Sequence, residues 1–350
     1  MCKSPSFVIR VDGNSQIGSG HIMRTLALAN ALRTQGIGVK FITADTGFVA
    51  PLEKQHFSYI VLDAQWDAMM AELPRLCSVL EQEKPQLLLV DSYQATAEYL
   101  SMLRSKVPVV YFDDFTEKTY PVSGIVHYSI ASTLEEYTAL YRETPTKIFF
   151  GTQYTPLRQE FCIAELQPVA EQAINVLLTV GGADPFGSCA AILNYLLLQP
   201  QLHDLIFHPV IGGLSPALPQ VKKLAEEFSG RVIIHENVSK MAELMSACDL
   251  AISAGGSTLY ELCACGVPAI SFAYADNQCP NTEGFAKEGI IPYAGDWRKD
   301  AVAVLKNFAE YLSHMQLAAQ RLAQQQKMRQ VVDGKGAERL AAALINAFVE

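Results

Sequence analysis

The fold follows from one early segment, Phe7-Val8-Ile9-Arg10-Val11-Asp12-Gly13-Asn14-Ser15-Gln16-Ile17-Gly18-Ser19-Gly20-His21. Its first five residues are mostly apolar and predict a buried strand over 7–11. Residues 21–35 repeat apolar side chains three and four positions apart and are followed by Gly36, which predicts an amphipathic helix. A strand, a glycine turn and a helix in this order make up the first part of a βαβ unit, which is typical of parallel α/β sheets.

The same alternation continues along both halves of the chain. Apolar runs predict strands at 39–43, 59–62, 87–90 and 107–112, and then at 175–180, 206–211, 232–235, 250–253 and 269–272. Helical segments lie between them, including 219–228, 241–247 and 301–332, and a last helix begins at Ala337. Uninterrupted apolar strands separated by helices are typical of sheets that are covered on both faces. We therefore predict an α/β protein with two Rossmann-like, doubly wound domains that face a cleft.

Chain length and a change of pattern set the predicted domain boundary. The chain has 350 residues, which is more than one hydrophobic core usually organises. The segment 131–161 contains Pro145 and Pro156 and has weaker periodicity, so we predict domains over 1–158 and 159–350. In this prediction the last helix, which begins at Ala337, can pack back on the amino-terminal domain. Ligands of such folds bind at the carboxyl ends of the strands, so the turns there hold the candidate site residues.

The composition argues against several classes of protein. Half of the residues (50%) are apolar and the net charge is −9 without a long basic block, which disfavours a disordered chain and a nucleic-acid partner. The eight cysteines are scattered and form no CxxC pair, which predicts a reducing compartment and no zinc site. Residues 1–6 lack the apolar stretch of a signal peptide, and no run of about 18 apolar residues occurs. We expect a cytoplasmic protein without a membrane span.

The first glycine turn leads to a candidate catalytic residue. Gly18 and Gly20 let the backbone approach a ligand closely, and the helix start beyond them favours an anion. His21 lies in the first helical turn, where the helix dipole favours a neutral imidazole that can accept a proton from water. Arg24 lies three residues further on the same face. The alternatives are an ordinary tight turn and a histidine that only caps or packs.

Two glycine turns in the second half are candidate phosphate sites. The segment Gly255-Gly256-Ser257-Thr258 follows a strand and opens a helix that ends at Gly266, so its amides can cradle a diphosphate. Thr258 and Glu261 have the spacing of a capping box, which we favour over hydrogen bonds between Glu261 and ribose hydroxyls. The segment Gly181-Gly182-Ala183-Asp184-Pro185 follows another strand. Asp184 is either a ligand contact or, more simply, the N-cap before a proline at the first helical position.

Polar residues follow three more of the predicted strands. Asp91-Ser92-Tyr93 and Asp113-Asp114 reach the same edge of the first sheet as His21. Asp276-Asn277-Gln278 follows the strand 269–272, where side-chain amides can orient sugar hydroxyls or a reacting water. Ordinary turn formation is the alternative for each of these segments. The remaining histidines have no metal-ligand spacing, so we predict no metal site.

Taken together, these motifs resemble a known enzyme family. The segments 10–24, 181–185, 255–262, 276–278 and 333–336 resemble, in matching order, those of the UDP-2,4-diacetamido-2,4,6-trideoxy-β-L-altropyranose hydrolases of pseudaminic acid biosynthesis. That family is related to the glycosyltransferase that makes lipid II. The resemblance spans nearly the whole chain and implies a GT-B fold. It also implies a reaction without metal or cofactor, in which water attacks the anomeric carbon with inversion and UDP departs, and a link to flagellin glycosylation.

The resemblance also implies roles for individual residues. His21 is implied as the general base or water-positioning group, with Tyr93 and Asn277 as its active-site partners. One position departs from the family pattern, because Ser92 stands where the family commonly has a histidine. The candidate substrate-binding residues are Arg10, Asp12, Gly18, Gly20, Arg24, Asp114, Gly181, Gly182, Gly255, Gly256, Ser257, Thr258, Glu261 and Gln278.

Three other functions remain open at this point. A GT-B glycosyltransferase with a UDP-amino sugar donor uses the hydroxyl of a second substrate in place of water. A nucleotide-sugar-binding protein without turnover has no use for His21, Tyr93 and Asn277. A UDP-sugar 2-epimerase usually has several carboxylates in its cleft, for which Asp113 and Asp114 are candidates. We favour hydrolysis of a small UDP-amino sugar, because an inverting displacement needs one base and one positioned water.

Overall fold

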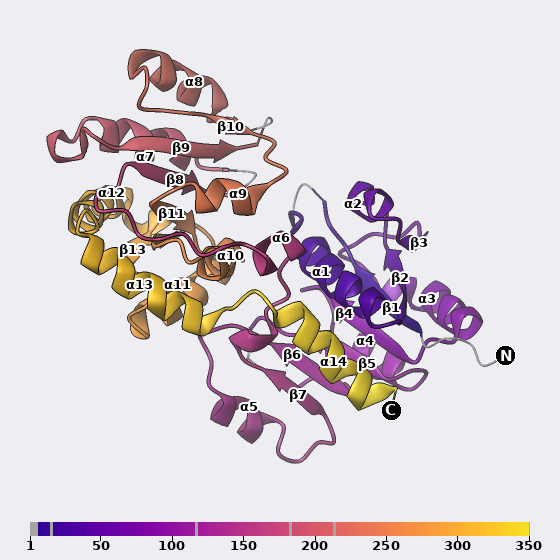
Figure 1. The fold of residues 1–350 in the computed structure, drawn as a ribbon. Coiled ribbons are helices and arrows are strands. Elements are labelled where there is room, and N and C mark those ends of the chain that lie inside the picture. The colour runs from indigo at the N-terminus through magenta and orange to yellow at the C-terminus, as the bar shows by residue number, and fades with distance from the viewer. Residues whose placement is uncertain (1–5, 15–16, 116–117, 182–183, 213–214, 350) are drawn as a thin grey trace. The chain divides into compact units, whose positions relative to one another are not determined.

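Two compact units make up the fold. The computed structural model describes residues 6–14, 17–115, 118–181, 184–212 and 215–349 (Figure 1). Unit 1 comprises residues 1–158 and 335–350, and unit 2 comprises residues 159–334. The carboxyl-terminal segment 335–350 therefore groups with the first half of the chain. Each unit is built on one parallel sheet with helices on both faces.

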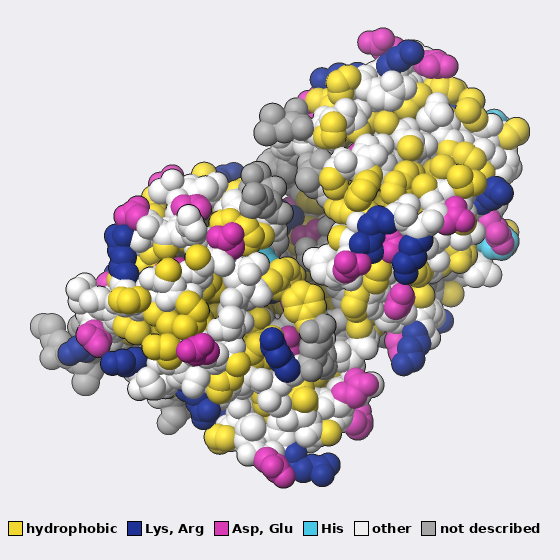
Figure 2. Space-filling view, turned by 180° about the vertical axis from the view of Figure 1, so that it is seen from behind, with side chains coloured by type: hydrophobic (Ala, Val, Ile, Leu, Met, Phe, Trp, Pro, Cys, Tyr) yellow, Lys and Arg dark blue, Asp and Glu magenta, His cyan; other side chains and the backbone are white. Residues whose placement is uncertain are grey.

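The described surface mixes charges of both signs. Figure 2 shows Lys and Arg side chains interspersed with Asp and Glu side chains and with apolar ones on the face it presents. Among the described residues, no helix combines the length and the apolar character that crossing a bilayer requires.

Unit 1 contains a seven-stranded parallel sheet in the order β3-β2-β1-β4-β5-β6-β7. Its strands are β1 (Ser6–Val11), β2 (Gly38–Thr43), β3 (Ser58–Val61), β4 (Leu87–Asp91), β5 (Val109–Phe112), β6 (Gly124–His127) and β7 (Lys147–Phe150). Its helices are α1 (Gly20–Thr34), α2 (Ala50–Lys54), α3 (Met69–Glu83), α4 (Ala97–Arg104), α5 (Leu134–Leu140), the 3-10 helix η1 (Thr152–Tyr154) and α14 (Gly336–Phe348). The strand order reverses between β1 and β4, and ligands of doubly wound sheets bind at such a switch point.

Both faces of the unit 1 sheet are covered by helices. One face packs against α3, α4 and α5 through a buried cluster that includes Leu73, Leu100 and Tyr137. Helix α1 packs on β1 and β2, and α14 lies beside α1 and also touches β7 (Figure 1). Strands β1 and β4 are buried along almost their whole length, which fixes the ends of both strands in space.

Unit 2 contains a six-stranded parallel sheet in the order β10-β9-β8-β11-β12-β13. Its strands are β8 (Asn175–Thr179), β9 (Ile206–Ile211), β10 (His235–Glu236), β11 (Leu250–Ala254), β12 (Ala269–Ala273) and β13 (Tyr293–Asp296). Its helices are α6 (Gln159–Cys162), α7 (Ser188–Leu197), η2 (Pro200–Leu202), α8 (Leu218–Glu227), α9 (Met241–Ser246), α10 (Thr258–Cys265), η3 (Asp276–Gln278), α11 (Cys279–Lys287), α12 (Trp297–His314) and α13 (Ala318–Val331).

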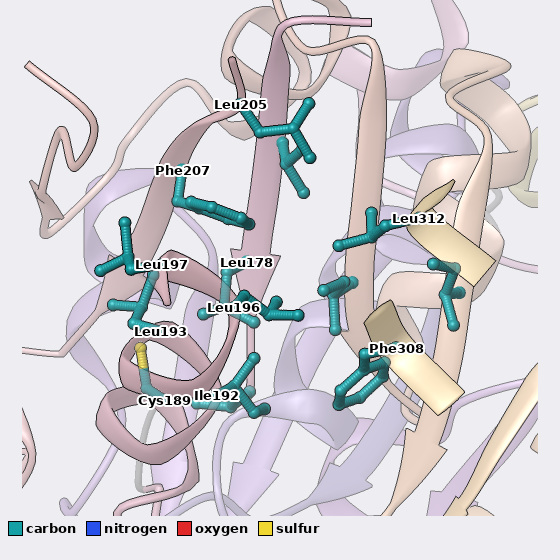
Figure 3. Close-up of a cluster of buried hydrophobic side chains, with 14 of the residues drawn as sticks. Leu178, Cys189, Ile192, Leu193, Leu196, Leu197, Leu205, Phe207, Phe308 and Leu312 are labelled. Carbon is teal, nitrogen blue, oxygen red and sulfur yellow. The ribbon is translucent and has the colours of Figure 1, made fainter. Parts of the chain in front are cut away.

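The core of unit 2 lies between its sheet and helices α7, α8 and α12. Figure 3 shows Leu178 of β8 among Ile192 and Leu196 of α7 and Phe308 and Leu312 of α12, all of them buried. On the sheet's other side α10 packs on β11 and β12 and against α13. Each fully buried aliphatic or aromatic side chain stabilises the fold by about 1.5–3 kcal/mol. This packing holds the ends of β8, β11 and β12 in place.

Some elements differ from the sequence prediction. The strand predicted over 232–235 is present only in part, because β10 covers His235–Glu236 and Val232 makes an isolated bridge to Phe207. Strands β6 and β7 lie at 124–127 and 147–150, and β7 falls inside the segment assigned to the domain junction. In β6 only Ile125 and Val126 are apolar, and β7 begins with Lys147, so neither strand contains an apolar run of four residues.

Candidate functional site

Paired strands bring His21 and Asp91 together in unit 1. Val11 of β1 lies opposite Asp91 of β4, so α1 begins beside the end of β4. The Nδ1 atom of His21 is 2.6 Å from Oδ1 of Asp91, and both residues are buried. With the proton on Nδ1, the imidazole donates to the carboxylate and Nε2 remains an acceptor. Nε2 has no hydrogen-bond partner within the described ranges, so this ring is set up to accept a proton.

Asp91 is held in its ionised form. Burial acts to raise the pKa of Asp91, but the Arg24 guanidinium and His21 outweigh it and hold this pKa well below its usual range. Arg24 donates from Nε to Oδ2 of Asp91 at 2.7 Å and from Nη2 to Oδ1 at 2.6 Å. The carboxylate therefore fixes both the tautomer and the orientation of His21.

Arg24 also binds a second carboxylate. Its Nη1 and Nη2 atoms donate to Oδ1 and Oδ2 of Asp114, each at 2.9 Å, and Nη1 donates to the hydroxyl of Tyr128 at 2.7 Å. The guanidinium carbon lies 5.1 Å from the centre of the Phe112 ring. Arg24 and Asp114 were predicted as substrate-binding residues, and in the structure they pair with each other.

A small pocket lies beside His21. It is lined by Asp12, Ile17, His21, Trp66, Asp91, Ser92, Tyr93 and Gln94. Its volume of about 10 Å³ is close to the space that one water needs. The rings of Tyr93 and His21 meet edge to face, and Tyr93 is 40% exposed. Partial burial, and then the charge of Asp114, raise the pKa of Tyr93, so its hydroxyl keeps its proton at neutral pH.

Arg10 and Asp12 form a second buried network behind this pocket. Arg10 is fully buried and donates from Nη1 to Oδ2 of Asp12 at 2.6 Å. Its Nε and Nη2 atoms donate to the two carboxylate oxygens of Glu72, each at 2.7 Å. Glu72 also accepts from the Tyr99 hydroxyl, and Asp12 accepts from the amide of Ala44, both at 2.7 Å. Arg10 thus orients Asp12, which lines the pocket.

Glu72 and Trp66 were not predicted from the sequence. Glu72 lies in the amphipathic helix α3, where a glutamate in the first turn is expected to be solvated, yet it is 3% exposed. Trp66 lies in the loop before α3. The only signal that could have pointed to Glu72 is the buried strand arginine, because a buried Arg10 needs carboxylate partners.

Three turns meet at the carboxyl ends of β8, β11 and β12 in unit 2. A Cβ atom on Gly181, which has a φ of +80°, would lie 2.8 Å from the Tyr274 hydroxyl. A Cβ atom on Gly255 would lie 2.4 Å from Cγ2 of Thr282 and 2.9 Å from the carbonyl oxygen of Gln278. Both glycines are therefore needed for the turns to approach the segment after β12.

The start of α10 offers backbone donors. Ser257 is the N-cap, and no side chain caps this end of the helix. The amides of Ser257 and Thr258 have no protein hydrogen-bond partner among the described residues. Free N–H groups at a helix start, together with the helix dipole, favour an anion such as a phosphate.

Comparisons with known proteins agree with this architecture. Residues 177–343 match the model of the "Glycosyltransferase family 28 C-terminal domain". The crystal structure of MurG from Acinetobacter baumannii superimposes with a TM-score of 0.69 at 15% identity, over 98% of this chain and 100% of that one. The chain has the GT-B fold.

Curated relatives of this GT-B chain include a named hydrolase. The chain is 25% identical over 289 residues to the UDP-2,4-diacetamido-2,4,6-trideoxy-beta-L-altropyranose hydrolase of Campylobacter jejuni. This alignment covers 81% of this chain and 96% of the hydrolase. The chain is 27% identical over 347 residues to the spore coat polysaccharide biosynthesis protein SpsG of Bacillus subtilis, and this alignment covers 97% of this chain and 98% of SpsG. An uncharacterized protein of Methanocaldococcus jannaschii is 25% identical, and the chain spans 54% of its length. The resemblance inferred from the sequence motifs is confirmed.

Two capping predictions for the GT-B chain need correction. The capping box at Thr258 and Glu261 is wrong, because Ser257 is the N-cap and Thr258 is already helical. Asp184 is not the N-cap of α7, because that residue is Gly187, but its carboxylate accepts from the amide and hydroxyl of Ser188 at 2.8 and 2.7 Å. Pro185 is not the first helical residue, because α7 begins only at Ser188.

Of the remaining predicted residues of the GT-B chain, one supports a turn, and the others are an exposed asparagine and several glycines. Gln278 is buried and accepts from the Tyr274 amide at 2.9 Å, so it supports the turn after β12. Asn277 is exposed in η3, and Gly256 has open space beside its Cα. Gly18 has a φ of +74°, and Gly20 is the first residue of α1. Gly182 lies outside the described residues.

Proposed function

We propose that this chain is an enzyme that hydrolyses a UDP-linked 2,4-diacetamido-2,4,6-trideoxy sugar to UDP and the free sugar. The observation that carries the proposal is the buried His21–Asp91 pair beside a pocket with room for about one water. The name of the Campylobacter jejuni relative supports the choice of substrate. The GT-B fold and the family 28 match support a UDP-sugar as the broader substrate class.

His21 acts as the general base in this proposal. Its Nε2 atom takes a proton from the water while the water oxygen attacks the anomeric carbon. The bond between that carbon and the β-phosphate oxygen breaks, and UDP leaves with the electron pair. A single displacement of this kind inverts the anomeric centre. Asp91 stabilises the imidazolium as it forms, and the Tyr93 ring packs against the imidazole.

The turns of unit 2 hold UDP in this proposal. The free amides of Ser257 and Thr258 and the dipole of α10 balance the charge that develops on the leaving diphosphate. The exposed Asn277 orients the sugar or the reacting water, and Glu261 hydrogen-bonds the ribose. The backbone of Gly181, Gly255 and Gly256 comes close to the nucleotide. The activity belongs to pseudaminic acid biosynthesis.

A glycosyltransferase is the second candidate, because residues 177–343 match a glycosyltransferase domain. The two candidates differ only in the acceptor, which is water in one and the hydroxyl of a second substrate in the other. The same fold and the same base serve both reactions.

One experiment separates the two. The protein is incubated in ¹⁸O-water with UDP-2,4-diacetamido-2,4,6-trideoxy-β-L-altropyranose or UDP-N-acetylglucosamine, without any acceptor, and the products are followed by NMR and mass spectrometry. Release of UDP with ¹⁸O in the anomeric hydroxyl and inverted configuration supports hydrolysis. Release only after an alcohol acceptor is added supports the transferase, and retained configuration contradicts the role of His21.

A further inference from the structure

Arg24 lies between two carboxylates, and only one of them touches His21. Asp91 contacts both Arg24 and His21, whereas Asp114 reaches Arg24 through two hydrogen bonds of 2.9 Å. The side chain of Arg24 is 10% exposed, that of Asp91 is 0% exposed and that of Asp114 is 22% exposed. Charges that are shielded from water in this way interact more strongly than charges on the surface.

This cluster carries one negative charge in excess. Burial acts to raise the pKa of Asp114, but Arg24 outweighs it and holds this pKa below its usual value, so Asp114 and Asp91 are both ionised. The guanidinium of Arg24 keeps its positive charge. Two carboxylates and one guanidinium sum to −1 while His21 is neutral, and to zero once His21 has accepted a proton.

The other titratable groups near His21 are the same in the native protein and in the variants described below. The carboxylate of Asp12, at the end of β1, is paired with Arg10. Burial raises the pKa of Tyr128 to about 12, so this phenol after β6 stays neutral. Burial lowers the pKa of His127, which stays neutral as well. The carboxylate of Asp113 accepts hydrogen bonds from the Phe115 amide and the Tyr137 hydroxyl, and Tyr93 is neutral.

Asp114 determines whether the negative charge of Asp91 is balanced by Arg24 or is left to balance a protonated His21. Without Asp114, the Arg24 guanidinium alone would neutralise Asp91, and an imidazolium at His21 would be an uncompensated buried charge, which is costly. With Asp114 present, Arg24 is already balanced, and Asp91 is available to stabilise the imidazolium.

We propose that Asp114, acting through Arg24, is a positioning residue that sets how readily His21 accepts a proton. The catalytic meaning of this inference rests on the proposed function, but the proton affinity of His21 is a property of the protein without substrate. It goes beyond a substrate-binding role for Asp114, because it requires no contact between Asp114 and a ligand.

The test is an NMR titration of the His21 imidazole in histidine-labelled protein without substrate, assigned with His21→Gln. In Asp114→Asn the midpoint of the titration is expected to fall by about one to two pH units. In Arg24→Gln it is expected to rise, because two carboxylates then face the ring without a cation. Misfolding cannot produce two opposite shifts. Unchanged midpoints, or shifts in the same direction, would overturn the proposal.

Two conservative variants and one control complete the experiment. Asp114→Glu and Arg24→Lys keep the charges and are expected to bring the midpoint back toward that of the native protein. Glu83→Gln removes a carboxylate that pairs with Lys40 on the surface of the same unit, and it is expected to leave the midpoint unchanged. A midpoint that moves in Glu83→Gln as it does in Asp114→Asn contradicts the specific role of Asp114.

The activity assay separates this inference from the proposed function. During hydrolysis of the UDP-sugar, the acid limb of the pH profile of kcat/KM is expected to move to lower pH in Asp114→Asn, without a change in UDP affinity. If the midpoints shift as stated but no hydrolysis occurs, the proposed function fails and the inference stands. If hydrolysis occurs with unchanged midpoints, the inference fails and the function stands.

Discussion

The ring of Tyr93 meets the imidazole of His21 edge to face, with 4.5 Å between the ring centroids. Tyr93 in turn contacts the ring of Phe115 at 4.9 Å. Aromatic contacts of this geometry stabilise the pair by about 0.5–1.5 kcal/mol beyond the buried area. The imidazole is therefore restrained by the Asp91 carboxylate at Nδ1 and by a ring packed against it.

Replacing Tyr93 separates the contribution of its ring from that of its hydroxyl. Tyr93→Ala removes the ring contact and is expected to lower kcat about tenfold or more, because His21, the proposed base, loses part of its fixed orientation. Tyr93→Phe keeps the ring and is expected to retain most of kcat. Steady-state hydrolysis gives both values, and UDP binding by calorimetry is the control, because the predicted UDP residues lie in unit 2. An equal loss in both variants would assign the effect to the hydroxyl.

Asp91→Asn is expected to destabilise the fold in a pH-dependent way. The folded-state pKa of Asp91 is held well below the ordinary value of about 3.9 by Arg24 and His21, against the effect of burial. A carboxylate of this kind contributes stability that is present above its unfolded pKa and is lost as the pH falls through its folded pKa. The unfolding free energy of Asp91→Asn should be lower than that of the native protein by about 3–5 kcal/mol near neutral pH, and this gap should shrink below about pH 4.

Urea unfolding at pH 7, 5 and 3, followed by circular dichroism, measures this gap. Asp63→Asn is a suitable control, because Asp63 is 77% exposed on the side chain and pairs with Arg75 on the surface. A gap that stays constant down to pH 3 would show that the ionised form of Asp91 does not stabilise the fold.

The sequence allowed the strand–turn–helix units to be predicted, because their signals are local. The apolar run of β1, the glycines at 18 and 20 and the apolar periodicity of α1 all lie within about thirty residues. The place of His21 in the first helical turn made it a candidate base, and the family resemblance implied the same role. Its pairing with Asp91 was not predicted, because it depends on β4 being the neighbour of β1, which is a property of the strand order.

The corrections at the site concern a helix boundary and a long-range contact, and a local sequence pattern fixes neither of them. The start of α10 differs by one residue from the predicted start, and this shift alone removes the capping box at Thr258. Arg10 was predicted as a substrate-binding residue, but it is fully buried, and its partner Glu72 comes from helix α3, which packs on one face of the sheet. Which face of that helix is buried, and against which strand, is decided by packing.

Glu72 is expected to be one of the most stabilising polar residues of unit 1. It binds the fully buried Arg10 through two hydrogen bonds, so Glu72→Gln or Glu72→Ala leaves a buried guanidinium with Asp12 as its only carboxylate partner. Breaking a buried ion pair from one side costs about 3–5 kcal/mol. The matched control Glu83→Gln breaks the partly exposed pair with Lys40 and should cost at most about 1 kcal/mol. Urea unfolding compares the two, and equal losses would contradict the assigned role of Glu72.

The adjacent glycines 255 and 256 offer a matched test of the second site. A Cβ atom on Gly255 would lie 2.4 Å from Thr282 and 2.9 Å from the carbonyl oxygen of Gln278, whereas one on Gly256 would have nothing within 4 Å. Gly255→Ala must therefore push the turn away from the segment after β12, which is expected to cost about 1–3 kcal/mol of stability. Because the same turn carries the free amides of Ser257 and Thr258, UDP affinity should fall at least about tenfold. Gly256→Ala should leave the unfolding free energy nearly unchanged, and urea unfolding with calorimetry of UDP binding measures both effects. If Gly255→Ala binds UDP as tightly as the native protein, the amides of this turn do not hold the diphosphate.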